Sequence, residues 1–476
     1  MISLSDSALI VALEKIIGAE QVITAPNDLE PYLIDWRKRY KGQAIAALRP
    51  ANTTEVAEIV KLCAANHIAI VPQGGNTGMC GGATPNPTGR QVVISLQRMN
   101  RVRSVDIANQ TMTIEAGCIL KNVQLAATEA NRYFPLSLGS EGSCTIGGNL
   151  STNAGGTAVL RYGNTRELCL GLEVVLPSGE ILNSLRGLRK DNTGYDLKDL
   201  FIGAEGSLGI ITAAVIKIFP IPVAQWTALV AVKDAQGAVE LLNHFQSGAS
   251  AQLTGFEMMS DESLALLKHY YPTLASPLQG PNAYEVLVEI SDYESAEHAM
   301  QLMEHILEKA MESGCATDAA IASNLSQAQK FWDMREHIPL AQADDGQNIK
   351  HDVSLPISAI PVFIETCNTL LRQQYPGVRV INYGHLGDGN LHYNIAGANS
   401  SETGQFFNQY SKEIQALVYQ EVEKYNGSIS AEHGVGQQKV DYLLGHRGDI
   451  AVQVMKSIKQ ALDPHGLMNP GKVLVK

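Results

Sequence analysis

Two spaced imidazoles in one short segment are the residues of this sequence best suited to chemistry. The segment YGHLGDGNLHYN begins at Tyr383. Asp388-Gly389 between apolar flanks predicts a two-residue hairpin turn, which sets His385 opposite His392 and Tyr383 opposite Asn394. Directly opposed residues share one face of a sheet, with Cβ atoms about 5 Å apart. Two neighbouring imidazoles suit a divalent metal ion, with a carboxylate as third ligand and one position open for a substrate.

A later loop of small residues carries a carboxylate beside an imidazole. It reads Ser430-Ala431-Glu432-His433-Gly434-Val435-Gly436. Small residues pack poorly in a core, but they allow close approach of another group to the backbone. From the hairpin spacing alone, two histidines that bond within the hairpin are slightly favoured over a metal site. The loop around Glu432 and His433 shifts the balance toward a metal site.

Three glycine-rich segments are the second feature that could bind a ligand. They are PQGGNTG at 72–78, residues 139–156, and GAEGSLG at 203–209. Glycine leaves backbone N–H groups open to an anion such as phosphate or pyrophosphate. One glycine loop is usually only a turn, whereas three that are rich in small polar residues suit one long cofactor. The absence of Gly-x-x-x-x-Gly-Lys-Ser/Thr excludes a P-loop, and the absence of Gly-x-Gly-x-x-Gly argues against an NAD-binding Rossmann unit.

Alternating strands and helices must position these segments in the first half of the chain. Asn52 followed by Glu55 predicts a helix start, with an apolar face that extends to Cys63. A second helix is expected at 119–130. Apolar or alternating runs predict strands at 68–71, 92–96, 111–116, 172–176, 180–182 and 209–218.

Pro220 and Pro222 mark the expected domain boundary, beyond which glycine is rarer and the helices are longer. The expected strands there are 227–233, 253–257, 284–290, 316–322, 350–355, 379–383 and 391–395. The expected helices are 235–246, 295–313, 325–336, 358–374, 403–425 and 448–462. The class is α+β, with an antiparallel sheet covered by helices. We expect one domain at 1–220, a second at 221–425, and a C-terminal segment, 426–476, that returns to the first domain and completes the active site.

Composition bounds the partners and the compartment. The chain has 476 residues and a formal net charge of −12, and its 45% hydrophobic content excludes wholesale disorder. The acidic balance argues against nucleic acid or an anionic membrane as the main partner. The seven scattered cysteines form no Cys-x-x-Cys pair and suit buried, reduced thiols. No integral membrane segment or signal peptide is evident, so we expect a cytoplasmic protein.

Together the glycine segments resemble the FAD domain of the vanillyl-alcohol-oxidase family. The resemblance rests on PQGGNTG, GSxxIGGN, NAGG and GAEGSLGIIT, and it covers nearly the whole chain. It implies two small α+β subdomains that hold an extended FAD, with the pyrophosphate on the first loop, and an α+β substrate (cap) domain. The first loop contains no His, so we expect non-covalent FAD. The implied FAD-binding residues are Pro72, Gln73, Gly74, Gly75, Asn76, Thr77, Gly78, Met79, Gly139, Ser140, Gly142, Ser143, Ile146, Gly148, Asn149, Thr152, Asn153, Gly155, Gly156, Glu205, Gly206, Gly209, Ile210 and Asn469.

GHLGDGNLH and SAEHGVG together resemble the FAD-linked D-2-hydroxyacid dehydrogenases of this family, in particular the D-2-hydroxyglutarate dehydrogenase branch. The resemblance implies that His385, His392 and Glu432 bind Zn²⁺. It also implies that His433 is the catalytic base.

The same resemblance implies that Arg335, Lys350 and Asn394 bind the substrate. Without it, ordinary surface charge would explain Arg335 and Lys350 better. This branch often has a Thr four positions after the arginine, which helps to bind the distal carboxylate. Here that position is Pro339, which weakens the case for 2-hydroxyglutarate specifically but not for a 2-hydroxyacid.

The implied reaction is metal-assisted oxidation of a D-2-hydroxyacid, first of all D-2-hydroxyglutarate, to the 2-oxoacid by hydride transfer to FAD N5. D-lactate, D-malate and glycolate are alternative substrates. A flavin-free zinc hydrolase would leave the glycine segments unexplained. A non-catalytic FAD-binding subunit of a glycolate-oxidase-type complex is the third alternative, although the complete His and Glu set argues against it. The expected electron acceptor is an electron-transfer flavoprotein or a quinone, and a homodimer is compatible with the acidic charge and long helices.

Overall fold

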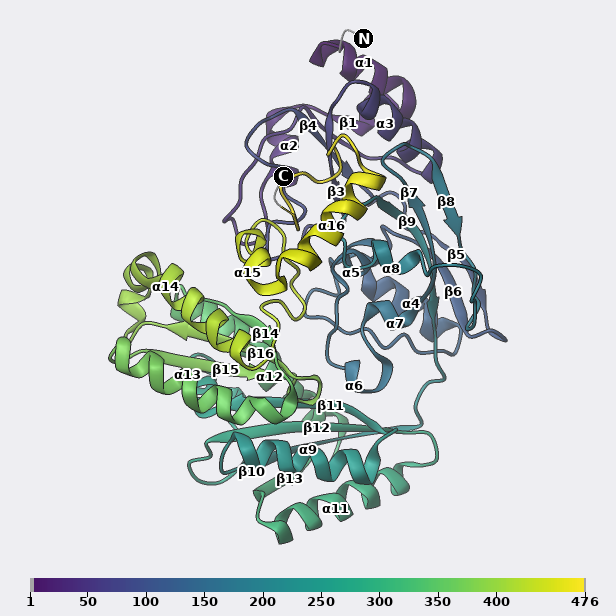
Figure 1. Cartoon of the computed structure of the whole chain (residues 1–476). Coiled ribbons are helices and arrows are strands. Elements are labelled where there is room, and N and C mark those ends of the chain that lie inside the picture. Colours follow the sequence, from purple (N-terminus) through teal and green to yellow (C-terminus); the bar gives the residue numbers. More distant parts are fainter. Residues whose placement is uncertain (1–3, 475–476) are drawn as a thin grey trace. The chain divides into compact units, whose positions relative to one another are not determined.

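The computed structural model describes residues 4–474 and divides into two compact units (Figure 1). The first unit contains the chain up to Gly156, then Tyr162–Ile221, and the chain from Glu432 onward. The second unit contains Thr157–Arg161 and Pro222–Ala431. The first unit is therefore discontinuous in sequence, because the end of the chain rejoins the part that carries the glycine segments.

A four-stranded sheet in the first unit positions the first glycine segment. Its strand order is β1 (Val22–Ile23), β2 (Ala46–Leu48), β4 (Gln91–Ser95) and β3 (Ala69–Gln73), and the last three strands are parallel. Helices α1 (Asp6–Ile17), α2 (Pro26–Leu33) and α3 (Thr53–Ala65) contact strands of this sheet. The predicted start of α3 is confirmed, since the Asn52 side chain accepts the Glu55 N–H at 3.0 Å. The chain passes directly from β3 into the glycine loop.

A five-stranded antiparallel sheet completes the first unit. Its order is β5 (Val102–Asp106), β6 (Thr111–Glu115), β9 (Ile210–Lys217), β7 (Cys169–Val175) and β8 (Ile181–Ser184). The other helices of the first unit are α4 (Leu120–Glu129), α5 (Ile146–Thr152), α7 (Thr165–Leu168), α8 (Lys198–Phe201), α15 (Leu443–Arg447) and α16 (Asp449–Leu462). The short helix α6 (Val159–Tyr162) lies mostly in the segment Thr157–Arg161 of the second unit. After α16 the chain pairs with β3: the Ile70 N–H donates to the Leu467 carbonyl at 2.8 Å, and the Asn469 N–H donates to the Ile70 carbonyl at 2.7 Å.

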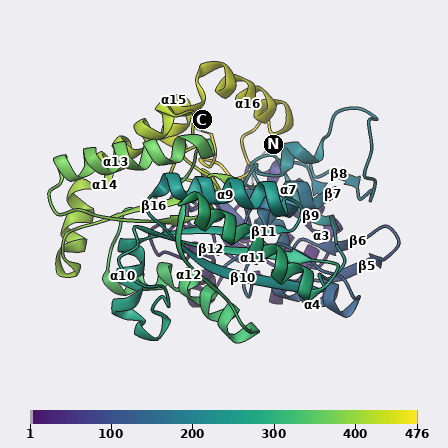
Figure 2. The ribbon, with the colours of Figure 1, turned by 90° about the horizontal axis from the view of Figure 1, so that it is seen from below.

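The second unit is built on one seven-stranded antiparallel sheet. Its order is β13 (Ala316–Ile321), β10 (Ala224–Val232), β12 (Tyr284–Asp292), β11 (Leu253–Ser260), β15 (Arg379–Gly384), β16 (Asn390–Ala396) and β14 (Asp352–Ser354). Figure 2 shows α9 (Ala235–Ala249) and α13 (Ile360–Gln374) on one side of the sheet, and α10 (Asp261–Tyr270) and α12 (Leu325–Asp345) on the other. The remaining long helices are α11 (Ala296–Ser313) and α14 (Thr403–Lys424). The predicted α+β class with an antiparallel, helix-covered sheet is confirmed.

Two helices of the second unit differ from the prediction. The helix expected to end near residue 336 continues through Pro339 to Asp345 as α12. Proline removes one N–H from the helix ladder, but Ala341, Gln342 and Asp345 are buried beyond it and hold the last turns in place. Helix α10 was not predicted, although Ser260 caps it through the Ser263 N–H.

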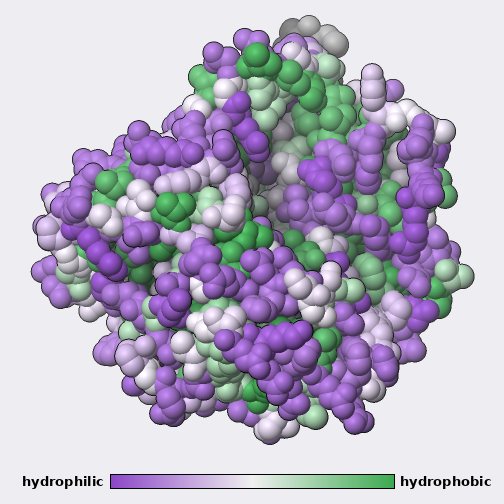
Figure 3. All heavy atoms as spheres, turned by 60° about the horizontal axis from the view of Figure 1, so that its bottom comes forward, coloured by the Kyte–Doolittle hydropathy of each residue, from purple (hydrophilic) through white to green (hydrophobic). Residues whose placement is uncertain are grey.

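The described residues separate into a buried core that contains the cysteines and a mostly hydrophilic surface. All seven cysteines are free and buried, as predicted, and burial raises the pKa of the Cys63, Cys169 and Cys367 thiols to about 12. Hydrophilic residues cover most of the face that Figure 3 shows. Within residues 4–474, no helix combines the length and the apolar character that crossing a lipid bilayer requires.

Glu289 on β12 provides a prediction about stability. Its carboxylate accepts hydrogen bonds from the Trp332 indole at 2.8 Å and from the hydroxyls of Thr254 at 3.2 Å and Thr227 at 3.3 Å. Burial raises the pKa of this carboxyl above its usual value and outweighs the three hydrogen bonds, which lower it. With a raised pKa in the fold, Glu289 contributes stability at low pH, and this contribution is lost as the pH rises through the folded-state pKa.

Glu289→Gln is therefore expected to reduce the fall in unfolding temperature between about pH 4 and pH 8, measured by differential scanning fluorimetry. Gln keeps the shape of the side chain but cannot ionise. The exposed Glu304 on α11 provides the matched control, because Glu304→Gln removes a carboxylate that water solvates in both states. Identical pH profiles for wild type and Glu289→Gln would contradict the prediction.

Candidate functional site

The first glycine segment forms a loop whose backbone lines a pocket in the first unit. The pocket is lined by residues from all three glycine segments and by His433. The N–H groups of residues 74–78 donate no hydrogen bond to any atom of residues 4–474. Asn76 in the middle has a φ of 53°, in the left-handed region. Consecutive N–H groups arranged around a left-handed residue form a concave anion site, which suits a pyrophosphate.

Two side chains of the loop hold its shape. The Gln73 amide donates to two backbone carbonyls and so does the Asn76 amide, at distances between 2.9 and 3.2 Å. The acceptors are the carbonyls of Tyr32 and Ala83 for Gln73, and those of Pro31 and Ile34 for Asn76. With both amides directed at the protein, the backbone of this loop is the part offered to a ligand.

The second glycine segment contributes polar atoms that lack protein partners. Thr145 Oγ1 and Asn149 Nδ2 are buried, line the pocket, and have no hydrogen-bond partner among the described residues. Buried polar atoms in native structures are nearly always satisfied, so these two indicate a polar ligand. Together with the open N–H groups of the first loop, they fit a long cofactor with phosphate and carbonyl groups, such as FAD.

The pocket contains part of the predicted FAD-binding set. The members that line it are Pro72, Gln73, Gly74, Gly75, Asn76, Thr77, Gly78, Gly148, Asn149, Thr152, Glu205, Gly206, Gly209 and Ile210. Those outside its lining are Met79, Gly139, Ser140, Gly142, Ser143, Ile146, Asn153, Gly155, Gly156 and Asn469. The sequence analysis did not select Cys80, Gly82, Ala83, Leu96, Cys144, Thr145, Gly147, Ser151, Ile211 or, for this pocket, His433. Thr145 lies directly before the Ile-Gly-Gly-Asn motif, and this position in the sequence could have identified it as a pocket residue.

Several residues outside the lining have structural tasks instead. Ile146 is fully buried in the core. Asn153 uses its side-chain oxygen to accept the Arg166 N–H at 2.9 Å. The Asn469 amide donates to the carbonyls of Gly82 at 2.9 Å and Glu205 at 2.7 Å, which ties the C-terminal tail to the pocket wall.

Gly75 provides a prediction about cofactor binding. A Cβ at this position would lie 2.0 Å from the Ser143 carbonyl oxygen, so the first two glycine segments meet at a distance that only glycine allows. Gly75→Ala is expected to displace the loop and to yield protein with little or no flavin absorbance after purification. Gly139→Ala provides the control, because a Cβ there meets no atom within 4 Å. Normal flavin content in Gly75→Ala would contradict the structure of the loop.

The loop with Glu432 and His433 is held in the first unit by Glu205. The buried Glu205 carboxylate accepts the N–H groups of Val435 at 2.6 Å and Gly436 at 2.9 Å. Burial raises the pKa of this carboxyl, and the two N–H groups oppose that change. Glu432 in turn accepts the Gly156 N–H at 2.8 Å. The second and third glycine segments therefore hold the Glu432 carboxylate and the loop that carries His433.

In the second unit, the hairpin that carries His385 and His392 has a different register from the predicted one. β15 ends at Gly384, β16 begins at Asn390, and the Asn390 N–H donates to the His385 carbonyl at 3.1 Å. Tyr383 therefore lies opposite His392, and Asn394 lies opposite Ile381. The predicted two-residue turn was wrong, because a 3₁₀ turn at Leu386–Asp388 lengthens the connection. The two imidazoles are neighbours nevertheless, with ring centroids 5.5 Å apart.

Five side chains of the second unit form a closed network around this hairpin. Glu257 on β11 binds His385 Nδ1 through Oε1 at 2.5 Å and Arg335 Nε through Oε2 at 2.7 Å. The Arg335 guanidinium lies 4.8 Å from the centre of the Tyr383 ring, and the Tyr383 and His392 rings lie 5.0 Å apart. Burial alone would raise the pKa of the Glu257 carboxyl. The positive charges and hydrogen bonds of His385 and Arg335 outweigh burial and lower this pKa to about 2. The structure thus joins Arg335 to the histidine pair.

The other predicted substrate-binding residues are Asn394 on β16 and Lys350, which precedes β14. Buried Asn394 accepts the His351 N–H at 3.1 Å and donates to the Gln342 side chain at 3.1 Å. Lys350 directly precedes His351, is partly buried, and leads into β14. Asp352, on β14, lies with one carboxylate oxygen 3.9 Å from His392 Nδ1. The sequence analysis selected neither Glu257 nor Asp352.

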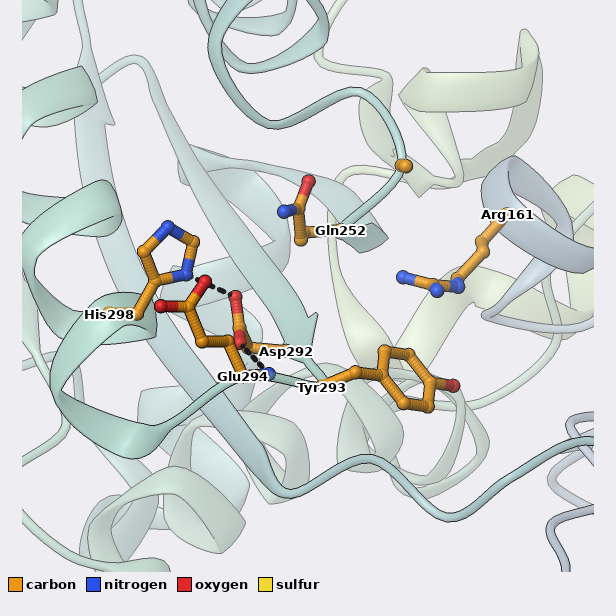
Figure 4. Close-up of a pocket in the computed structure, with 7 residues that line it drawn as sticks. Arg161, Gln252, Asp292, Tyr293, Glu294 and His298 are labelled. Carbon is orange, nitrogen blue, oxygen red and sulfur yellow. Dashed lines mark hydrogen bonds and ion pairs between the residues drawn. The ribbon is translucent and has the colours of Figure 1, made fainter.

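A separate pocket in the second unit contains none of the predicted site residues (Figure 4). It has a volume of about 350 Å³ and is lined by Arg161, Ala251, Gln252, Asp292, Tyr293, Glu294 and His298. Asp292 binds His298 Nδ1 at 2.7 Å and accepts the Glu294 N–H at 2.6 Å. The Arg161 guanidinium lies 4.8 Å from the centre of the Tyr293 ring. These partners tie the charged groups to the protein, and we assign the pocket no chemistry.

Comparisons with known proteins cover most of the chain. Residues 44–184 match the family described as "FAD binding domain", and residues 221–473 match "FAD linked oxidases, C-terminal domain". The chain is 38% identical to the mitochondrial D-2-hydroxyglutarate dehydrogenase of Arabidopsis thaliana, over 98% of this chain and 82% of that protein. It is 36% identical to a putative mitochondrial D-lactate dehydrogenase of Schizosaccharomyces pombe, over 98% of this chain and 87% of that protein.

A solved structure of p-cresol methylhydroxylase shares the fold. The TM-score is 0.77 at 17% identity, over 98% of this chain and 96% of that one. At this identity the likeness concerns the fold alone.

Proposed function

Because the chain belongs to the FAD-linked oxidase family, within the group that contains the D-2-hydroxyglutarate dehydrogenases, we propose that it oxidises a D-2-hydroxyacid with FAD as its cofactor. The similarity extends over 98% of the chain. The observation that carries the proposal most directly is the closed network that joins Arg335 to His385 and His392 in the second unit. A 2-hydroxyacid has a carboxylate, which an arginine can pair with, and a hydroxyl, which a metal ion held by two imidazoles could activate.

Each functional residue has one task in this reaction. FAD, when bound, supplies the acceptor for the hydride that leaves C2 of the substrate. His433 lines the same pocket as the glycine segments. In this proposal it accepts the proton of the substrate hydroxyl, as a neutral imidazole can near pH 7. Arg335 pairs with a substrate carboxylate and fixes the orientation of C2. Lys350 adds a positive charge, and Asn394 an amide, for the same substrate.

The FAD is bound without a covalent bond in this proposal. The loop 72–78 contains no His or Cys, the residue types that could attach a flavin there. Its open N–H groups and the buried, unsatisfied Thr145 and Asn149 atoms support tight non-covalent binding.

We further propose that His385, His392 and Glu432 hold Zn²⁺. When bound, the ion would supply a Lewis acid for the substrate hydroxyl. The support lies in the second unit, where the two imidazoles are adjacent and each has a carboxylate on its Nδ1 side: Glu257 for His385 and Asp352 for His392. A carboxylate behind a histidine ligand is the usual arrangement in zinc proteins.

D-2-hydroxyglutarate is the substrate we propose first. The chain's relatives at 36–40% identity over at least 95% of its length include mitochondrial D-2-hydroxyglutarate dehydrogenases from plants and animals. Pro339 is the observation that favours D-lactate as the second candidate, because it offers no hydroxyl one turn after Arg335 for a distal carboxylate. We also propose that the electron acceptor is an electron-transfer flavoprotein or a quinone. The proposed assembly is a homodimer, and the proposed location is the cytoplasm.

Turnover with a dye acceptor and a panel of hydroxyacids tests the substrate. We expect the highest kcat/KM for D-2-hydroxyglutarate, lower values for D-lactate, D-malate and glycolate, and no turnover of L-2-hydroxyglutarate. A preference for D-lactate would keep the reaction but replace the substrate. A flavin-loaded protein that turns over no member of the panel would contradict the proposed function.

A further inference from the structure

We propose that Glu257 is a positioning residue that sets both the metal-binding nitrogen of His385 and the orientation of Arg335. The inference rests on the proposed function of these two residues. It adds a residue that neither the sequence analysis nor the family comparison singled out.

The geometry of Glu257 supports this role. The side chain lies on the face of β11 that packs under α12, and the residue is 0% exposed. Each carboxylate oxygen has its own partner: Oε1 binds His385 Nδ1 at 2.5 Å, and Oε2 binds Arg335 Nε at 2.7 Å. His385 follows β15, and Arg335 lies on α12. One carboxylate thus connects three elements that are distant in sequence.

The contact with His385 decides which ring nitrogen is available to a metal. A neutral imidazole has one N–H, and a carboxylate at Nδ1 holds that hydrogen at Nδ1. Nε2 then keeps its lone pair for a metal ion, and the negative carboxylate makes that lone pair a stronger donor. Asp352 lies 3.9 Å from His392 Nδ1, so its effect on the second histidine is weaker.

The contact with Arg335 decides how its guanidinium is presented. Nε is engaged by Glu257, and the plane is held against the Tyr383 ring with the guanidinium carbon 4.8 Å from the ring centre. The terminal nitrogens are then the ones that meet a substrate carboxylate, in the two-point geometry that arginine favours. A change at Glu257 is therefore expected to affect metal binding and substrate binding together.

Glu289 provides an internal comparison. The register of β11 and β12 pairs Gly255 with Glu289 and Glu257 with Leu287, so the two carboxyls lie on the same face of the sheet. Both carboxyls contact α12, at Trp332 for Glu289 and at Arg335 for Glu257. Glu289 has only neutral partners, whereas Glu257 binds the side chains of an arginine and a histidine. Both carboxyls are therefore covered by α12, and Glu257 differs from Glu289 in its partners, Arg335 and His385.

The test compares Glu257→Gln with Glu289→Gln in the full-length, FAD-loaded protein. Zn²⁺ affinity is measured by competition with a chromogenic chelator, and the ligand set is monitored by the visible absorption bands of the Co²⁺-substituted protein. We expect about 10–100-fold weaker Zn²⁺ binding and a changed Co²⁺ spectrum for Glu257→Gln. We also expect an increase in KM for the hydroxyacid. The FAD absorbance of Glu257→Gln should match wild type. The FAD absorbance, Zn²⁺ affinity, Co²⁺ spectrum and KM of Glu289→Gln should match wild type as well, because the change expected for that variant is confined to the pH dependence of its stability.

The outcomes separate the inference from the proposed function. If wild type and Glu257→Gln bind Zn²⁺ equally and with the same Co²⁺ spectrum, the role of Glu257 is wrong and the metal site stands. If wild type itself binds neither metal, the proposed metal site fails and the inference fails with it. Should Glu257→Gln not fold, Glu257→Asp keeps the charge on a shorter side chain, and unchanged metal affinity in that variant would equally overturn the inference.

Discussion

Replacing His433 with alanine is expected to lower the rate of flavin reduction by a D-2-hydroxyacid by about 10²–10⁴-fold, the usual contribution of a positioned general base. His433 lines the same pocket as the glycine loop 72–78, and Glu205 fixes the backbone that follows His433. The flavin should remain bound, because the open N–H groups of residues 74–78 do not depend on this side chain. Anaerobic stopped-flow absorbance measures the reduction directly.

His305→Ala provides the matched control for this experiment, because His305 is an exposed imidazole on α11. It should leave the rate unchanged. A second readout is the pH profile: the rate of the wild type should rise as an imidazole loses its proton, and the residual rate of His433→Ala should lack that limb. A near-normal rate in His433→Ala would exclude this residue as the base.

Rigorous removal of divalent metal is expected to abolish turnover while leaving the flavin absorbance intact. In the proposed function, His385 and His392, whose rings lie 5.5 Å apart, would hold the ion together with Glu432. Without the ion, nothing lowers the pKa of the substrate hydroxyl before the hydride leaves. The measurement is dye-linked turnover after dialysis against EDTA, with metal content determined on the same samples.

Added Zn²⁺ should restore turnover to the EDTA-treated enzyme, and EDTA saturated with Zn²⁺ beforehand should have no effect. His392→Ala should mimic the loss of metal and resist restoration. An enzyme that keeps full activity at a metal content near zero would show that the histidine pair has a different task.

The local features of the site could be predicted from the sequence. The loop 72–78 follows a strand and is rich in glycine, so a backbone-lined pocket at this point could be predicted, and the binding of an anion there stays a prediction. The proximity of His385 and His392 was also predictable, because both lie within one hairpin, although their predicted position directly opposite one another was wrong. These features depend on residues that are close in the chain.

Features that depend on distant elements could not be predicted. Glu257 is the single acidic residue of β11, and its contacts appear only when β11, α12 and the hairpin are packed together. The hairpin register was mispredicted for a related reason: Asp388-Gly389 suggests a tight turn, but the His385 carbonyl accepts the Asn390 N–H and extends the loop. Helix α12 continues past Pro339 because the residues beyond it are buried, and burial is not visible in a local pattern.

Anaerobic titration of the purified, oxidised flavoprotein with D- and L-2-hydroxyglutarate tests the central claim most directly. It requires no electron acceptor, so it isolates the reaction between substrate and flavin. We predict that the D-isomer bleaches the flavin absorbance and yields one 2-oxoglutarate per flavin reduced, and that the L-isomer leaves the spectrum unchanged. A flavin that neither D-2-hydroxyglutarate nor any other D-2-hydroxyacid reduces would contradict the account.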